Sequence, residues 1–182
     1  MPNSVLWLLR FPPHAEANLR AEARKRGITA ADQLVFSDAA PKAEHIRRGR
    51  LAEVCLDTAV VSGMSTGCDI LWSGTPAVTV RGSTLASRVG ASLLTACGLQ
   101  ELVCESLVEY ENLAVALAID DDKYMRLRTR LEGGREEMPL FDTRRWVANL
   151  EAGFGAMWER HEAGLPPDHI DVKDTMGRPS EL

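Results

Sequence analysis

Short apolar runs alternate with helical stretches along most of the chain. The runs are apolar at successive positions rather than at every second one, which is typical of strands covered on both faces. They fall at residues 4–9, 34–36, 53–57, 77–80 and 102–104. Strands that alternate with helices predict βαβ units. We therefore expect an α/β fold built on a doubly wound, mostly parallel sheet.

Helical periodicity fills the segments between these runs. Leu85, Val89 and Leu93 recur every fourth residue, and Gly98 follows as a helix end. By the same reasoning we expect helices at residues 14–26, 42–52, 69–72, 85–97 and 110–117, one opened by the acidic residues 120–122, and a last one that begins near residue 142. Residues 1–164 are expected to form one lobe, and residues 165–182, with three prolines, a mobile tail.

Composition places the chain among ordinary globular proteins. It has 182 residues, of which 45% are hydrophobic and 26% are charged. The formal net charge of −5 argues against a general binder of nucleic acid or membrane surfaces, because phosphate contacts need a basic face. No apolar run approaches the ~18–20 residues of a membrane span, and the first residues lack the basic segment of a signal peptide. We interpret the chain as soluble and intracellular.

The four cysteines give no sign of a metal site. Cys55, Cys68, Cys97 and Cys104 lie in apolar stretches, no two of them form a CxxC pair, and no paired histidines accompany them. We interpret them as small buried hydrophobic residues of a protein in a reducing compartment, and we expect no bound metal.

The loop after the third predicted strand is the first candidate site, since ligands of parallel α/β sheets bind outside the carboxyl ends of the strands. Residues 62–69 read SGMSTGCD, and small residues let a backbone approach a ligand closely. Free N–H groups at the start of the following helix favour a phosphate or pyrophosphate, to which the Ser65 and Thr66 hydroxyls can donate. The alternative is an ordinary helix cap, since Ser and Thr are common caps. The loop has neither the dinucleotide nor the P-loop glycine pattern.

The segment from Ala40 to Arg48 is the second candidate. Lys42, His45 and Arg48 are three residues apart, so a helix brings them near one side, where a ring can stack on a base and cations can meet ribose or pyrophosphate. The alternative is a solvated basic helix face. Asp57 and Asp69 are further candidates, which either accept hydrogen bonds from sugar hydroxyls or cap local backbone.

These two loops also carry a resemblance to a known family. The chain resembles the eukaryotic protein O-GlcNAc transferases, collinearly from Pro2 to about His169, in the segments VLWLLRFP (5–12), APK (40–42), HIRR (45–48), VCLDT (54–58), LWSGTP (71–76), TLASRV (84–89) and PDH (167–169). The match covers the C-terminal half of that family's catalytic region, a Rossmann-like C-terminal lobe of the GT-B fold. The resemblance implies transfer of N-acetylglucosamine from UDP-GlcNAc to Ser or Thr hydroxyls of nuclear and cytoplasmic proteins. It also implies an inverting reaction that needs neither metal nor cofactor.

The resemblance further implies a role for each matching residue. The Ala40 backbone would read uracil, His45 would stack on the base, and Arg48 would lie beside it. Lys42 and Asp69 would hold the ribose. Ser65 and Thr66 would hold the donor diphosphate at the helix start. The family usually has His-Thr-Thr there, whereas this chain has Met64-Ser65-Thr66, and a thioether cannot replace a hydrogen-bonding imidazole next to the sugar or phosphate.

The family's remaining parts have no counterpart in these residues. Its members carry tetratricopeptide repeats and an N-terminal catalytic lobe, which supplies the proposed catalytic base. We therefore expect a fragment with no catalytic residue of its own, inactive alone. One alternative is a non-catalytic remnant that acts as an interaction module. Another is the lobe of a Spindly-type protein O-fucosyltransferase, which shares the Asp-Thr and Gly-Thr-Pro segments.

Overall fold

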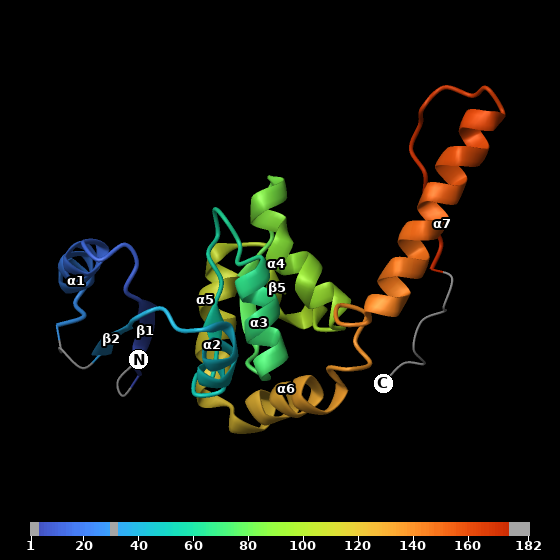
Figure 1. Cartoon of the computed structure of the whole chain (residues 1–182). Helices are drawn as coiled ribbons and strands as arrows, with labels where there is room; N and C mark the ends of the chain where they lie inside the picture. The colour runs from blue at the N-terminus through green and yellow to red at the C-terminus, as the bar shows by residue number, and fades with distance from the viewer. Residues whose placement is uncertain (1–3, 30–32, 175–182) are drawn as a thin grey trace. The chain divides into compact units, whose positions relative to one another are not determined.

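The computed structural model describes residues 4–29 and 33–174 and divides the chain into two compact units. Unit 1 comprises residues 1–52 and unit 2 residues 53–182. Figure 1 shows the helices and strands of each unit, and each unit is described by itself.

Unit 1 is a single βαβ motif followed by a helix. Its elements are β1 (Leu6–Leu9), α1 (Ala15–Lys25), β2 (Leu34–Ser37) and α2 (Lys42–Gly49). β1 and β2 pair in parallel, with Leu6 opposite Leu34 and Leu9 opposite Ser37. The Trp7 indole N–H donates to the Ser37 hydroxyl at 2.8 Å, which adds a side-chain bond to the ladder. From α1, the Arg20 guanidinium lies 4.8 Å from the centre of the Phe36 ring and joins the helix to β2.

Unit 2 holds a second parallel sheet and most of the helices. Its strands β3 (Cys55–Leu56), β4 (Ala77–Val80) and β5 (Val103–Cys104) lie in the order β3-β4-β5, and both pairings are parallel. The helices are α3 (Ser65–Ser73), α4 (Leu85–Ala96), the 3₁₀ turn η2 (Gln100–Leu102), α5 (Leu107–Ile119), α6 (Asp121–Gly134) and α7 (Thr143–Glu162).

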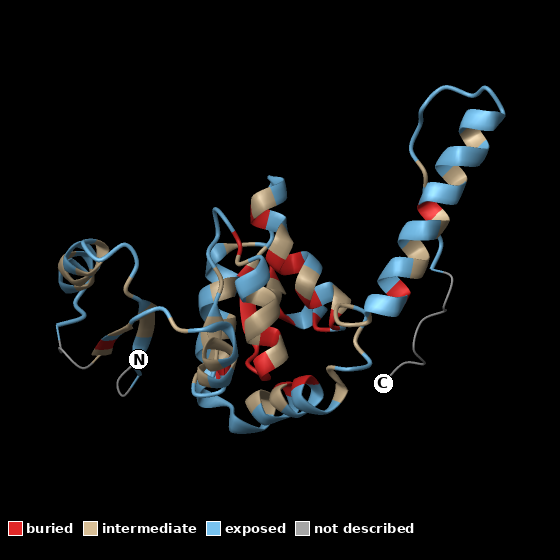
Figure 2. Ribbon diagram, in the orientation of Figure 1, coloured by how far each residue is buried: buried red, intermediate tan, exposed pale blue. Residues whose placement is uncertain are grey.

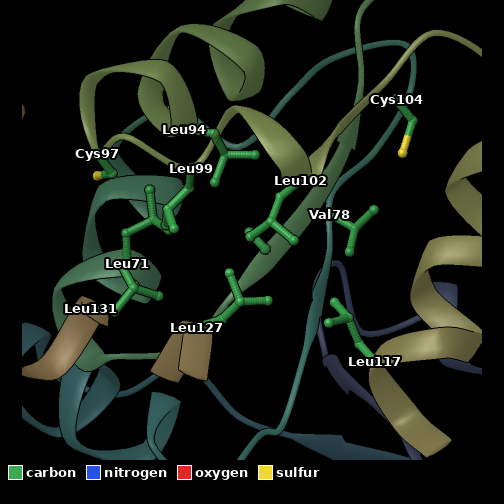
Figure 3. Close-up of a cluster of buried hydrophobic side chains, with 11 residues drawn as sticks. Leu71, Val78, Leu94, Cys97, Leu99, Leu102, Cys104, Leu117, Leu127 and Leu131 are labelled. Atoms are coloured by element: carbon green, nitrogen blue, oxygen red, sulfur yellow. The ribbon is translucent and has the colours of Figure 1, made fainter. Parts of the chain in front are cut away.

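The core of unit 2 surrounds the central strand β4. Side chains alternate along a strand, so Ala77 and Thr79 share one face, where they line a cavity with residues of α3 and α4. Val78 points to the opposite face and lies on the side of Leu117 from α5 (Figure 3). Helices therefore cover both faces of this sheet. The largest fully buried apolar side chains of the cluster are Leu71, Val78, Leu94, Leu99, Leu102 and Leu131.

The predicted α/β class and parallel strand pairing are confirmed, and the five strands lie where apolar runs predict them. Three details differ from the expectation. The strands form two sheets, one in each unit, instead of one, and β3 is shorter than residues 53–57. β3 is short because its ladder begins at the Cys55 N–H, which donates to the Pro76 carbonyl, and ends at the Asp57 N–H, which donates to Val78. Helix α3 also begins four residues before the predicted start at Asp69.

Helix α7 is exposed along most of its length (Figure 2). Its exposed apolar side chains are Trp146, Val147, Leu150, Phe154, Met157 and Trp158. No helix among the described residues is long and apolar enough to cross a membrane.

The segment after α7 runs back along the helix. A Cβ at Gly153 would lie 3.3 Å from Val172, and the Arg145 Nε donates to the Asp174 carboxylate at 2.9 Å. Residues 165–174 thus have side-chain contacts to α7 but no helix or strand. The rest of the predicted mobile tail, residues 175–182, lies outside the described residues, and its mobility stays a prediction.

Candidate functional site

The second candidate segment of the sequence forms helix α2 in unit 1. Ala40 and Pro41 lead into it, Lys42 is its first residue and is exposed, and His45 and Arg48 are half-buried. The helix confirms that these three side chains lie near one side. The alternative of a solvated basic helix face agrees with the exposure of Lys42 but not with the half-buried position of Arg48.

Arg48 is held in place by its neighbours in unit 1. Its Nη2 donates to the Asp38 carbonyl at 3.1 Å, and its guanidinium carbon lies 6.0 Å from the centre of the Trp7 ring. Its Nε is buried and has no hydrogen-bond partner among the described residues. The guanidinium is therefore tied to unit 1 by Nη2, while the buried Nε donor is unused among the described residues.

The first candidate loop leads into α3 in unit 2, and the N-terminus of α3 has no side-chain cap. Met64 is the capping residue, and its thioether accepts no capping hydrogen bond. Ser65 and Thr66 are the first two helical residues, and both are exposed. The first intrahelical bond is made by Cys68, whose N–H donates to the Met64 carbonyl at 3.1 Å.

The missing side-chain cap leaves backbone N–H donors without an acceptor at the start of α3. The N–H groups of Ser65, Thr66 and Gly67 have no acceptor within the part of the chain that the structure describes, as expected for the first turn of a helix without a side-chain cap. The alternative that Ser65 and Thr66 merely cap the helix is wrong, because neither is the capping residue. Asp69 is half-buried in the next turn. The helix start combines a partial positive charge with exposed hydroxyls, which suits an anion.

Helix α4 begins differently. Thr84 and Ser87 form a capping box in which the Thr84 hydroxyl accepts from the Ser87 N–H at 3.3 Å and the Ser87 hydroxyl accepts from the Thr84 N–H at 3.1 Å. At the start of α4, side chains thus satisfy the N–H groups of Thr84 and Ser87. Sequence reasoning did not identify this cap, although Thr and Ser three residues apart before an apolar helix are a signal for it.

Asp57 at the end of β3 is the centre of a hydrogen-bond network. Its Oδ1 accepts from the Gly63 N–H at 2.8 Å, and its Oδ2 accepts from the Thr79 hydroxyl at 2.6 Å. The Tyr110 hydroxyl donates to the Asp57 backbone carbonyl at 3.0 Å. Of the two roles that the sequence left open for Asp57, the structure shows the local one: its carboxylate binds the backbone of the loop before α3.

Burial shifts two titrating groups next to Asp57. It raises the pKa of the Cys55 thiol to about 11 and that of the Tyr110 hydroxyl to about 12, and the Asp57 carboxylate contributes to both shifts. Cys55 is therefore protonated at neutral pH and is no nucleophile there. Among the described residues, no three His, Cys, Asp or Glu side chains are grouped so that they could hold a metal ion.

A cavity of about 60 Å³ lies between α3, β4 and α4, with Asp57, Thr66 and Gly90 in its lining. Nucleotide pockets are several times larger, roughly 300 Å³ or more, so a nucleotide does not fit inside it. The eight candidate residues are divided between the units: Ala40, Lys42, His45 and Arg48 belong to unit 1, and Met64, Ser65, Thr66 and Asp69 to unit 2.

Parallel strands, helices on both sheet faces and an uncapped helix start after a strand are the features of nucleotide-binding α/β domains. Comparison with known proteins specifies the class further. Residues 1–150 match the family model described as Glycosyl transferase family 41, and the chain belongs to that family.

Its relatives include two enzymes of the same name. The chain is 46% identical over 173 residues to the probable UDP-N-acetylglucosamine–peptide N-acetylglucosaminyltransferase SEC of Arabidopsis thaliana. It is 45% identical over 170 residues to the UDP-N-acetylglucosamine–peptide N-acetylglucosaminyltransferase of Caenorhabditis elegans. These matches cover 94% and 93% of this chain but only 18% and 15% of the relatives. Plant relatives named SPINDLY match with lower identity over 68% of the chain.

A solved structure agrees with this assignment. The chain superimposes on a mutant of the Thermobaculum terrenum O-GlcNAc transferase with a TM-score of 0.82 and 30% identity, covering 90% of this chain and 32% of that one. The resemblance noted in the sequence is thereby confirmed, as is the GT-B type of α/β fold.

Proposed function

We propose that this chain is the donor-binding lobe of a protein O-GlcNAc transferase and that it binds UDP-GlcNAc. The observation that carries the proposal is the uncapped start of α3, where three N–H groups and two hydroxyls are available to an anion. The names of the two relatives support UDP-N-acetylglucosamine as the donor and peptides as acceptors.

Each candidate residue has a role in this proposal. Ser65 and Thr66 bind the diphosphate together with the first N–H groups of α3. Met64 lies next to the sugar or phosphate without donating a hydrogen bond. Asp69 and Lys42 hold the ribose hydroxyls. In unit 1, His45 stacks on the uracil, Arg48 lies beside it, and the Ala40 backbone binds its edge.

The reaction that we propose needs no metal. A diphosphate leaving group requires positive potential, and the N–H groups and dipole of α3 supply it. The catalytic base and the acceptor contacts belong to a further lobe of a longer protein, with tetratricopeptide repeats, so this chain has no catalytic residue and transfers no sugar alone. Residues 1–164 form the GT-B lobe, and the protein acts in the nucleus and cytoplasm.

Calorimetric titration with UDP tests the binding site. We expect His45→Ala and Asp69→Ala to weaken UDP binding by roughly five- to tenfold each, since each removes one stacking or hydrogen-bond contact. Arg47→Ala is the matched control, because Arg47 is exposed on the same helix as His45 and pairs with Glu44. Equal affinity of all four proteins for UDP would contradict the site. GDP, titrated in parallel, tests the recognition of the base.

One observation favours the alternative of a non-catalytic interaction module, namely Met64 in place of the family's His. A chain that binds neither UDP nor UDP-GlcNAc would support that alternative.

A further inference from the structure

Asp57 has no role in the proposed contacts to the donor, yet its carboxylate binds the loop that leads into α3. We propose that Asp57 is a positioning residue: it fixes the backbone at Gly63, and thereby presents the first turn of α3 to the donor diphosphate before the donor binds. This inference rests on the proposed function, since it concerns the same helix start.

Both carboxylate oxygens of Asp57 are used in this geometry. Oδ1 accepts from the Gly63 N–H at 2.8 Å, one residue before the helix cap, and Oδ2 accepts from the Thr79 hydroxyl at 2.6 Å. Thr79 is buried in the central strand, so the carboxylate links the loop to the buried sheet of unit 2. A charged acceptor strengthens both bonds, because hydrogen bonds to a carboxylate are roughly twice as strong as neutral ones.

The space around this carboxylate is fitted to it. A Cβ at Gly90 of α4 would lie 2.3 Å from Asp57 Oδ2 and 2.6 Å from Thr79 Oγ1, so only glycine allows α4 this close. A Cβ at Gly63 would lie 3.3 Å from the Gly67 N, which shows how closely the loop passes over the first turn of α3.

The loop has little apolar packing to hold it otherwise. Val60 is 80% exposed and Val61 is 53% exposed. Among the described residues, its backbone hydrogen bond to the rest of the unit is that of the Ser62 N–H, which donates to the Ala86 carbonyl at 2.9 Å. The position of the loop therefore depends on polar contacts. Of these, the hydrogen bond from the Gly63 N–H to Asp57 is made by the residue directly before the α3 cap, Met64. Anion binding at a helix start gains from N–H groups that are already oriented, because their ordering costs nothing when the ligand arrives.

The test compares variants of the full chain by two readouts: UDP affinity, and hydrogen exchange of the backbone around Gly63 without UDP. We expect Asp57→Ala to raise that exchange at least about tenfold and to weaken UDP binding by roughly five- to tenfold. Asp57→Asn is the conservative variant. Its side-chain oxygen still accepts from Gly63, so its UDP affinity should stay within about threefold of wild type.

Tyr110→Phe is the control for a merely structural role. It removes the hydrogen bond to the Asp57 carbonyl without touching the carboxylate, so it should lower the thermal stability while leaving UDP affinity unchanged. If Asp57→Ala does not fold, Thr79→Val replaces it, because it removes one donor to the carboxylate with little change in shape. We expect Thr79→Val to give faster exchange at Gly63 and weaker UDP binding.

The outcomes separate this inference from the proposed function. If wild type does not bind UDP, the proposed function fails, and the positioning role fails with it. If wild type binds UDP and Asp57→Ala (or Thr79→Val) binds it equally well, only the positioning role is refuted. Losses of affinity that follow thermal stability across all variants, Tyr110→Phe included, also refute it. Weaker binding with faster exchange, restored in Asp57→Asn, supports it.

Discussion

Replacing Gly90 by alanine is expected to lower the free energy of unfolding by about 1–5 kcal/mol, although alanine is the better helix former. The new Cβ would lie 2.3 Å from Asp57 Oδ2 and 2.6 Å from Thr79 Oγ1, far inside van der Waals contact. This overlap can be relieved only if α4 moves or if the hydrogen bond from Thr79 to Asp57 breaks.

The magnitude follows from three effects. Overpacking a well-packed interior costs about 1–3 kcal/mol. Leaving the Thr79 hydroxyl and the Asp57 carboxylate unpaired costs about 1–3 kcal/mol more, and the helix propensity of alanine returns about 0.8–1 kcal/mol. The midpoint of thermal unfolding should accordingly fall by about 3–15 °C for a chain of this size.

Urea unfolding followed by far-UV circular dichroism measures this change. Gly133→Ala is the matched control, because Gly133 also lies in a helix of unit 2 but a Cβ there meets nothing within 4 Å. That variant should be as stable as wild type or up to about 1 kcal/mol more stable. In an Asp57→Ala background the cost of Gly90→Ala should shrink, because the nearest atom is gone. A Gly90→Ala protein as stable as wild type would refute the packing argument.

Three further predictions concern the donor, alkaline pH and α7. Met64→His should tighten UDP-GlcNAc binding in calorimetry, because imidazole donates a hydrogen bond that a thioether cannot; an unchanged Kd would show that position 64 does not contact the donor. Burial raises the pKa of Cys97 to about 12 and that of Tyr110 to about 12. The unfolded chain therefore loses these protons first, and urea titrations should give a lower free energy of unfolding at about pH 10.5 than at about pH 8. Equal values at the two pH would contradict these shifts. Phe154→Glu with Trp158→Glu should reduce self-association of the chain in sedimentation velocity, because both side chains are more than half exposed on α7. Wild type that stays monomeric at high concentration would refute this.

The strands of this fold are predictable from sequence because burial leaves a direct pattern. The run at residues 77–80 is apolar apart from Thr79 and coincides with β4. The apolar run itself does not specify which of its residues form hydrogen bonds with the neighbouring strand. Val54 continues the apolar pattern into β3, yet the ladder to β4 starts at Cys55.

The start of α3 shows where local propensity fails. Ser65, Thr66 and Gly67 are poor helix formers, so local propensity places the helix start near Asp69, whereas the family resemblance places it at Ser65 and Thr66. The structure begins the helix at Ser65, and α4 packs against this turn so closely that a Cβ at Gly67 would lie 2.8 Å from Leu93. Tertiary packing therefore outweighs propensity here, and one sequence without its contacts does not reveal it.

Residue types and helix spacing select Ser65, Thr66 and the α2 residues as candidates, and the structure places them at the start of α3 and on α2. Their role in binding stays a prediction. Asp57 was identified as polar and close to a strand end, but its partners Gly63 and Thr79 are distant in sequence by 6 and 22 residues. The hydrogen bond between Asp57 at the end of β3 and Thr79 of β4 leaves no signature in the hydrophobic pattern of the sequence.

The segment that runs back along α7 has a consequence for shortening this protein. Arg145 is 8% exposed, and Asp174 supplies an anion to its guanidinium. Replacing Asp174 by alanine removes that negative charge from a buried guanidinium, which should destabilise this part of α7. Ending the chain at Gly164 removes the same carboxylate together with Val172, which lies against Gly153 of the helix. A shortened protein that keeps α7 intact should therefore extend at least to Asp174.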